Sequence, residues 1–277
     1  MHHRLLLLFL GFLMISSPAD AQSGVVKYVR YSVQGRASYG ILEGDAIREL
    51  RAAPWIDATP TGQRVTAKDV TILAPSEPSK VLAVGLNYQT HIGERPAAAY
   101  PGLFAKQPTA IIGTGENIVL PPDATNTHYE GEMVIVIGKK ATRVAKAVAK
   151  EYVFGVTVGN DVSERDWQKN DLQWFRAKGS DTFGPLGPAI VTGVNYDDLL
   201  LQTRLNGEVV QSQRTKDLIF NVAEIVSYIS QYVTLMPGDV IYTGTPGTTR
   251  PIKAGDVVEV ELQDVGVLRN KVTQAVR

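Results

Sequence analysis

Residues 127–138, THYEGEMVIVIG, place two acids at the start of a segment that otherwise has the pattern of a buried strand. Side chains of a strand alternate between its two faces, so Glu130 and Glu132 share one face. From Met133 to Ile137 both faces are apolar. Such a strand is covered above and below, and we therefore expect the two glutamates to point toward the interior or toward the mouth of a cavity.

Two neighbouring carboxylates cannot both stay ionised in an interior without a cation between them, because each buried charge costs several kcal/mol unless it is paired. A divalent metal ion would meet this need. An isolated Glu-x-Glu pair is also typical of a solvated strand end whose acids contact lysines. The choice between these interpretations depends on features elsewhere in the chain.

The composition limits the kinds of partner and metal ligand. The 277 residues carry no net charge, 44% are hydrophobic and 20% are charged, which is typical of a globular protein that does not bind nucleic acid. The absence of cysteine excludes thiolate metal sites, disulfides and a cysteine nucleophile. Two of the four histidines lie in the first three residues. Oxygen ligands, and hence a hard cation, are the main option that is left.

The N-terminus has the pattern of a secretory signal peptide. A short basic start is followed by the apolar run Leu5 to Ile15 and by Ala19-Asp20-Ala21. We expect residues 1–21 to be a signal peptide cleaved after Ala21, and the mature protein to be exported to the periplasm with no further membrane contact. An uncleaved anchor or the remnant of a tag is the alternative.

Residues 22–78 are predicted to form a small β-rich domain. Residues 26–33 alternate with period two, and a turn at Glu43-Gly44-Asp45 joins residues 39–42 to residues 46–50 as a hairpin. Pro75 to Ser79 is rich in proline and serine and marks the boundary with a larger domain, residues 79–277.

A possible acid–base pair follows the short buried strand 81–85. His91 and Glu94 are three residues apart, so one helical turn would make them neighbours and let the carboxylate stabilise a charged imidazole. A His-x-x-Glu pair by itself is more often a surface contact.

A second buried strand, residues 152–159, ends in Asn160-Asp161 and offers a third carboxylate. Asp161 lies where a strand meets a helix, a frequent place for functional side chains. We predict a helix over residues 164–175, capped by Ser163 with Asp166 at the box position. Its stripe of side chains is Arg165, Gln168, Leu172 and Phe175.

Further signals come from the second half of the chain. A loop rich in glycine and proline, residues 176–188, carries Lys178 and Asp181. Asn206-Gly207 predicts a hairpin, and Asn221 with Glu224 predicts the capped start of an amphipathic helix.

Taken together, these motifs resemble the fumarylacetoacetate hydrolase family, in its branch of acylpyruvases and 2-hydroxyhepta-2,4-diene-1,7-dioate isomerases. The resemblance runs from about Lys80 to Val272. It depends on the order and spacing of five motifs: Asn87-Tyr88 with His91 and Glu94; Glu130-Gly131-Glu132; Gly159-Asn160-Asp161 with Arg165 and Gln168; Lys178 and Asp181 before Gly-Pro-Leu-Gly-Pro; and Gly244-Thr245-Pro246.

The resemblance implies an α+β, β-rich fold, a mixed β-sandwich roll with the small N-terminal β domain attached, in a homodimer. It also implies the roles of individual residues. Glu130, Glu132 and Asp161 would bind Mg²⁺ or Mn²⁺, with His91, Glu94 and Lys178 catalytic and Arg165, Gln168, Asp181 and Thr245 contacting the substrate.

The reaction that this resemblance favours is hydrolytic C–C cleavage of an acylpyruvate or a similar β-dicarbonyl compound through a metal-stabilised enolate. Isomerisation of an oxo-diene diacid, or decarboxylation of an oxaloacetate-like acid, would use the same site. Two further alternatives are a non-catalytic periplasmic binding or scaffold protein with a structural metal, and a structural Ca²⁺ site. Two features depart from the family: Gly247-Thr248-Thr249-Arg250 follows Pro246 where many relatives have a small residue and then Gly-Val, and an export signal is unusual.

Overall fold

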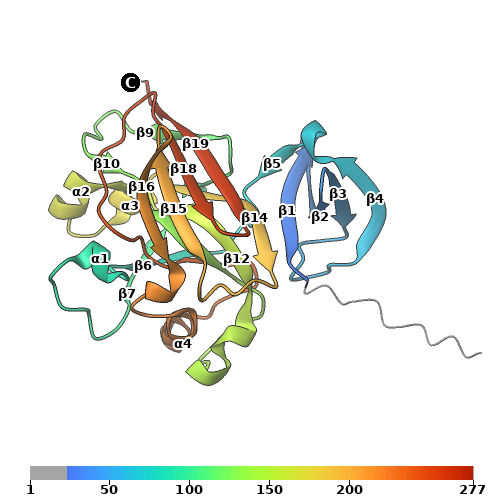
Figure 1. Cartoon of the computed structure of the whole chain (residues 1–277), viewed down its shortest axis with the longest axis horizontal. Helices are drawn as coiled ribbons and strands as arrows, with labels where there is room; N and C mark the ends of the chain where they lie inside the picture. Colours follow the sequence, from blue (N-terminus) through green and yellow to red (C-terminus); the bar gives the residue numbers. More distant parts are fainter. Residues whose placement is uncertain (1–23, 277) are drawn as a thin grey trace, which may run out of the picture.

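The computed structural model describes residues 24–276 (Figure 1). The predicted signal peptide, residues 1–21, lies outside the described residues. None of the helices in residues 24–276 is long and apolar enough to cross a bilayer.

The N-terminal strands form a small antiparallel unit beside the larger part of the chain (Figure 1). Its elements are β1 (Val26–Val33), β2 (Arg36–Glu43), β3 (Ala46–Leu50), β4 (Pro60–Thr66), the 3₁₀ turn η1 (Ala67–Asp69) and β5 (Thr71–Leu73). The predicted hairpin is confirmed, since Glu43 pairs with Ala46 across the turn. Val29, Tyr31 and Ile47 of this unit form a small buried core together with Ala189 of the larger part of the chain.

A long mixed sheet runs from these strands through the centre of the molecule. Its strands follow the order β4-β3-β2-β1-β14-β12-β11-β17-β6-β7, with β5 on β1 and β8 on β14. The central strands are β6 (Val81–Gly85), β7 (Gly102–Lys106), β8 (Ile111–Ile112), β11 (Gly131–Ile137), β12 (Val153–Asn160), β14 (Gly184–Thr192) and β17 (Val240–Tyr242). β11 lies between β12 and β17 and is buried along its whole length.

A second sheet packs against the first and completes the β-rich sandwich. Its order is β16-β15-β18-β19-β9. The strands are β9 (Asn117–Leu120), β15 (Leu200–Leu205), β16 (Glu208–Arg214), β18 (Val257–Leu262) and β19 (Gly266–Gln274). Asn206 and Gly207 both have positive φ angles, 53° and 86°, and close the predicted hairpin between β15 and β16.

The alternation predicted for β11 is present in the packing. Met133, Ile135 and Ile137 belong to the main core, which they share with side chains of the second sheet. Val134 and Val136 face the opposite side and pack in a smaller core with β6, β14 and β17. Glu132 shares the side of these two valines, so its carboxylate enters the protein.

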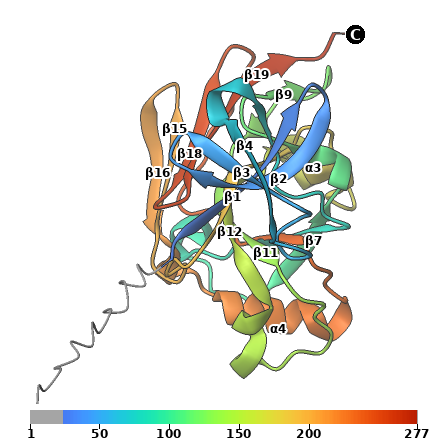
Figure 2. The ribbon, with the colours of Figure 1, turned by 90° about the vertical axis from the view of Figure 1, so that its right-hand side faces the viewer.

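The helices are short and lie around the sandwich. They are α1 (Gln89–Ile92), α2 (Arg165–Asn170), α3 (Phe175–Gly179) and α4 (Val222–Tyr232), with 3₁₀ turns η2 (Pro108–Ala110), η3 (Lys146–Tyr152) and η4 (Thr215–Asp217). α4 begins with the predicted capping box of Asn221 and Glu224. In Figure 2 it lies at the end of the molecule opposite the C-terminus.

The helix predicted over residues 164–175 is wrong in its start and its length. Ser163 does not cap it, because this residue belongs to β13 (Ser163–Glu164), which pairs with β10 (Thr127–His128). Glu164 is the cap instead, and its side chain accepts a hydrogen bond from the Trp167 N–H. The helix ends at Asn170, and Leu172 is 96% exposed instead of packing on a helical stripe.

Candidate active site

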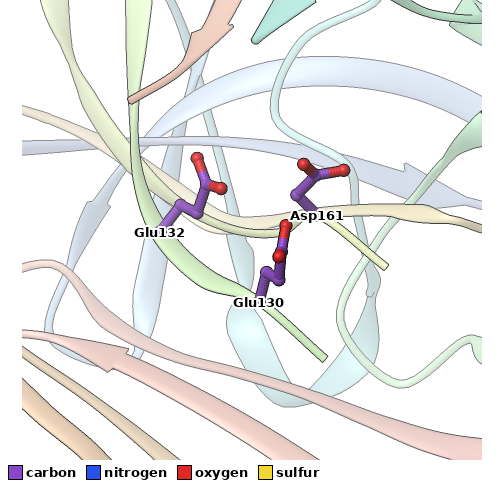
Figure 3. A group of neighbouring side chains, drawn as sticks. All are labelled: Glu130, Glu132 and Asp161. Atoms are coloured by element: carbon purple, nitrogen blue, oxygen red, sulfur yellow. The ribbon is translucent and has the colours of Figure 1, made fainter. Parts of the chain in front are cut away.

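Three buried carboxylates come together at the adjoining ends of two neighbouring strands (Figure 3). Glu130 precedes β11, Glu132 lies within it, and Asp161 follows β12. Each carboxylate offers one oxygen, and these three atoms lie within 4.8 Å of one another. The structure thus brings together the three metal ligands that the sequence suggested.

Backbone hydrogen bonds fix the relative position of these strand ends. The Glu130 N–H donates to Asn160 Oδ1 at 2.9 Å, and the Asp161 N–H donates to the Glu130 carbonyl at 2.8 Å. Because Gly131 also pairs with Asn160 across the ladder, the two ligand-bearing segments cannot slide past each other without breaking this register.

Three cations surround two of the carboxylates. Lys178 of α3 donates both to Glu130 Oε2 and to Asp161 Oδ2, each at 2.7 Å. Arg165, the first residue of α2, donates to Glu130 Oε1, and Lys106, at the end of β7, donates to Asp161 Oδ1, both at 2.5 Å. These contacts supply the positive charge that two buried acids need.

No lysine or arginine among residues 24–276 forms an ion pair with Glu132. The hydrogen bond that its side chain accepts among the described residues comes from the Gly244 N–H, at 2.6 Å. Gly244 has a φ of +108°, and a Cβ there would lie 2.7 Å from the Cβ of Asn87, so a larger residue could not present this N–H. This contact gives a physical reason for glycine in the Gly-Thr-Pro motif.

The pKa values of the two glutamates move in opposite directions. Burial favours the neutral form of Glu130, but Lys178 and Arg165 outweigh burial and hold its pKa well below the usual range. Burial, followed by repulsion from Asp161 and Glu130, raises the pKa of Glu132 well above its usual value. A divalent cation bound among the three acids would reverse this repulsion.

The raised pKa of Glu132 predicts a pH-dependent stability of the metal-free protein. Between the unfolded pKa of about 4.5 and the higher folded pKa, the folded state holds a proton that the unfolded state has lost, so stability falls as pH rises. The contribution of this group should reach about 1.4 kcal/mol for each pH unit. Urea unfolding from pH 5 to pH 8 with a chelator should show the fall, and Glu132→Gln should remove it. An equal slope in both proteins would contradict the prediction.

His91 points a ring nitrogen toward the carboxylates. Its Nδ1 lies 2.6 Å from the Gly247 carbonyl, which can only accept, so Nδ1 carries the proton. Its Nε2 lies 3.8 Å from Glu130 Oε1 and, in the neutral ring, has a free lone pair. A base therefore faces the cluster of acids.

The predicted pair of His91 and Glu94 is not formed. α1 ends at Ile92, and Gly93 follows with a φ of 64° and a ψ of −130°, which turns the chain away before Glu94. Glu94 is exposed, and no ion pair within residues 24–276 joins it to His91. The Gly247 carbonyl orients the imidazole in its place.

A cavity of about 520 Å³ opens over the three acids. Arg165 and Gln168 line it, joined by a hydrogen bond of 2.8 Å, and Thr245 lines it with its hydroxyl on the Gly131 carbonyl. Asp181 does not line this cavity; it is exposed and lines a separate hollow together with Gly179 and Thr182. The structure therefore brings together all of the predicted site residues except Glu94 and Asp181.

Sequence reasoning missed several residues of the site. Lys106 ends a strand with no charged pattern around it, and its role becomes visible only through its contact with Asp161. Phe104 and Trp174 meet edge to face at 5.3 Å and form an aromatic wall of the cavity. Thr249 binds Arg165 at 3.0 Å. This threonine lies in the segment Gly247 to Arg250, which departs from the family pattern. That departure was the one feature of the sequence that could have pointed to Thr249 as a site residue.

The donor set fits a divalent ion with a preference for oxygen ligands. Three carboxylates converge, and within residues 24–276 the ligand group contains no histidine or cysteine. Glu132, the acid without an ion pair, lines the same cavity. Mg²⁺ or Mn²⁺ would be held by Glu130, Glu132 and Asp161, with the remaining positions open to substrate or water.

The metal site can be tested at Glu132. Glu132→Gln keeps the shape of the side chain and removes one ligand charge, so Mg²⁺ or Mn²⁺ affinity should fall by at least about tenfold, which is roughly 1.4 kcal/mol. Calorimetric titration of chelator-treated protein measures this change. Unchanged affinity would place any bound metal elsewhere.

Comparison with known proteins gives a consistent result. Residues 80–273 match the fumarylacetoacetate (FAA) hydrolase C-terminal family, and residues 26–75 match the Rv2993c-like N-terminal family. The mitochondrial oxaloacetate tautomerase FAHD2A of Bos taurus is 39% identical over 259 residues, which cover 88% of this chain and 79% of the relative.

Two solved structures share the fold. The 5-carboxymethyl-2-hydroxymuconate delta-isomerase of Mycobacterium smegmatis has a TM-score of 0.86 and 42% identity, over 90% of this chain and 100% of that one. The maleylpyruvate hydrolase of Sphingobium sp. SYK-6, in complex with manganese (II) ion and pyruvate, has a TM-score of 0.76 and 28% identity over the same shares. With its sandwich fold, its three carboxylates and these matches, the chain belongs to the fumarylacetoacetate hydrolase family.

Proposed function

We propose that this protein is a divalent-metal-dependent enzyme that moves a proton on a 2-oxo acid, as a tautomerase or isomerase does. One observation carries the proposal: Nδ1 of His91 is held by the Gly247 carbonyl, so that in the neutral ring the lone pair is on Nε2, which faces the acids at 3.8 Å from Glu130. A base placed so close to the ligand cluster can take a proton directly from a substrate bound there.

Mg²⁺ or Mn²⁺, when bound, would neutralise the charge of the enolate that forms from a 2-oxo acid. The side chains of the protein perform the other tasks. His91 Nε2 accepts the proton from the carbon beside the oxo group and returns it at the end of the reaction. Arg165 and Gln168, already joined by a hydrogen bond, present donors that would orient a carboxylate of the substrate.

Lys178 supplies positive charge where oxygen becomes negative. Its ammonium lies between Glu130 and Asp161, and its side chain is only 2% exposed. Burial lowers the pKa of Lys178, but Asp161 and Glu130 outweigh this effect and raise it, so the group stays charged. A fixed charge in a water-poor cavity stabilises a developing oxyanion better than a charge in water does.

The relatives support proton transfer by their own activities, since a tautomerase and an isomerase are both more than a third identical to this chain. Hydrolytic C–C cleavage of an acylpyruvate is the second candidate. It is favoured by the cavity, which at about 520 Å³ has room for an extended β-dicarbonyl chain together with an attacking water.

A substrate panel separates these reactions. Keto–enol exchange of oxaloacetate, isomerisation of an oxo-diene diacid, cleavage of acylpyruvates and decarboxylation of oxaloacetate should each be followed with Mg²⁺ and with a chelator. We expect metal-dependent tautomerisation or isomerisation. Cleavage as the fastest reaction would favour the hydrolase, and no turnover of any substrate with Mg²⁺ or Mn²⁺ would contradict the proposal.

A further inference from the structure

Each of the three carboxylates has one oxygen engaged by a donor outside the cluster. The three contacts are Arg165 on Glu130 Oε1 at 2.5 Å, Lys106 on Asp161 Oδ1 at 2.5 Å, and the Gly244 N–H on Glu132 Oε2 at 2.6 Å. The second oxygens of Glu130 and Asp161 face Lys178, which lines the cavity. A carboxylate with one oxygen held by a donor favours binding an ion through its other oxygen. All three acids are therefore arranged to bind a metal through one oxygen each.

Lys106 is the most firmly placed of these donors. Its side chain is 0% exposed, and its Nζ also lies 3.4 Å from the Val162 carbonyl. It does not line the cavity over the acids, so it reaches Asp161 from the protein side. A substrate in the cavity does not reach Lys106 and cannot displace it from Asp161. Lys106 therefore acts as a positioning residue for the Asp161 carboxylate.

The number of oxygens per carboxylate matters for the choice of ion. Ca²⁺ takes six to eight oxygen ligands and often binds both oxygens of a carboxylate. Mg²⁺ requires a near-ideal octahedron and binds few carboxylates, through single oxygens, beside water or substrate. Three carboxylates that each bind through one oxygen give fewer oxygens than Ca²⁺ usually takes from its protein ligands, and they suit an octahedral ion with open positions.

We propose that Lys106 sets the metal selectivity of the site: by holding Oδ1 of Asp161 it keeps this ligand to one oxygen and disfavours Ca²⁺ relative to Mg²⁺. The proposal rests on the metal site of the proposed function, but not on its reaction. With Lys106 replaced, Asp161 can turn and present both oxygens.

Lys106→Met tests this inference by calorimetric titration of metal-free protein with Mg²⁺ and, separately, with Ca²⁺. The ratio of the two affinities is the readout, because the loss of a positive charge should strengthen the binding of any cation. We expect the ratio to shift toward Ca²⁺ by at least about tenfold, the lower end of the effect of replacing a group that holds a ligand. Lys169→Met is the matched control. This lysine lines the same cavity, is exposed and has no carboxylate within 4 Å among residues 24–276, so its loss should leave the ratio unchanged.

Arg165→Gln provides a second variant, because it frees Oε1 of Glu130 and should shift the ratio in the same direction. It decides the question if Lys106→Met does not fold by circular dichroism. If Lys106→Met folds and its affinity ratio equals that of wild type, the inference is wrong. If Lys106→Met does not fold, an unchanged ratio in Arg165→Gln overturns the inference instead. A wild-type protein that binds neither ion overturns the metal site, and with it the proposed function. The two failures can be told apart, because in the first both ions still bind and in the second neither ion binds. Neither titration depends on turnover.

Discussion

Replacement of His91 by alanine should lower kcat by about 10²- to 10⁴-fold, the usual range for the loss of a general acid–base group. The base that the geometry offers is Nε2, which faces Glu130 while Gly247 fixes the opposite side of the ring. The metal ligands are untouched, so Mg²⁺ affinity should stay within about twofold of wild type. Steady-state kinetics on the best substrate of the panel, with a parallel metal titration, measure both effects.

Two outcomes would contradict this assignment. A wild-type rate in His91→Ala would show that another residue is the base. A loss of Mg²⁺ affinity as large as the loss of kcat would show that His91 acts through the metal site. Decarboxylation of oxaloacetate offers an internal control, because loss of CO₂ requires an electron sink but no base in its first step. This activity, where present, should survive His91→Ala much better than proton transfer does.

Glu94→Gln is the matched variant for the remaining part of the predicted dyad. Since Glu94 is exposed and the Gly247 carbonyl already orients the imidazole, its neutralisation should change kcat far less than the loss of His91 does. A loss of kcat equal to that of His91→Ala would show that Glu94 reaches the ring during turnover.

The sequence predicted those parts of the site that depend on local pattern. An alternating strand with acids at its start places Glu130 and Glu132 inside, and the structure confirms this placement at 4% and 2% exposure. The hairpin at Asn206-Gly207 follows in the same way from backbone preference, as does the capping box at Asn221.

Contacts between distant segments could not be predicted in this way. Lys106 and Asp161 are 55 residues apart, and the pattern of β7 does not show that its last side chain turns toward another strand end. The predicted helix cap failed for a similar reason. The Ser163 hydroxyl donates to the Asp161 carbonyl at 2.7 Å, so the site itself uses the group that would have capped the helix.

Replacement of Lys178 by methionine should destabilise the metal-free protein by about 3–5 kcal/mol, the usual result of removing one partner from a buried ion pair. The ammonium of Lys178 lies 2.7 Å from both Glu130 Oε2 and Asp161 Oδ2. Without this ammonium, less positive charge offsets the repulsion between Glu130 and Asp161 and between these two acids and Glu132. The melting temperature in chelator should fall by roughly 6–20 °C for a chain of this size.

Mg²⁺ should reverse most of this loss, because an ion held by Glu130, Glu132 and Asp161 would supply positive charge to the two acids that Lys178 now contacts. The gain in melting temperature on adding Mg²⁺ should therefore be larger in Lys178→Met than in wild type. Lys169→Met removes the same charge from an exposed position on α2 and should change stability by less than about 0.5 kcal/mol. If metal-free Lys178→Met were as stable as Lys169→Met, then Lys106 and Arg165 alone would compensate the acids. Lys178 would in that case serve catalysis without contributing to the stability of the fold.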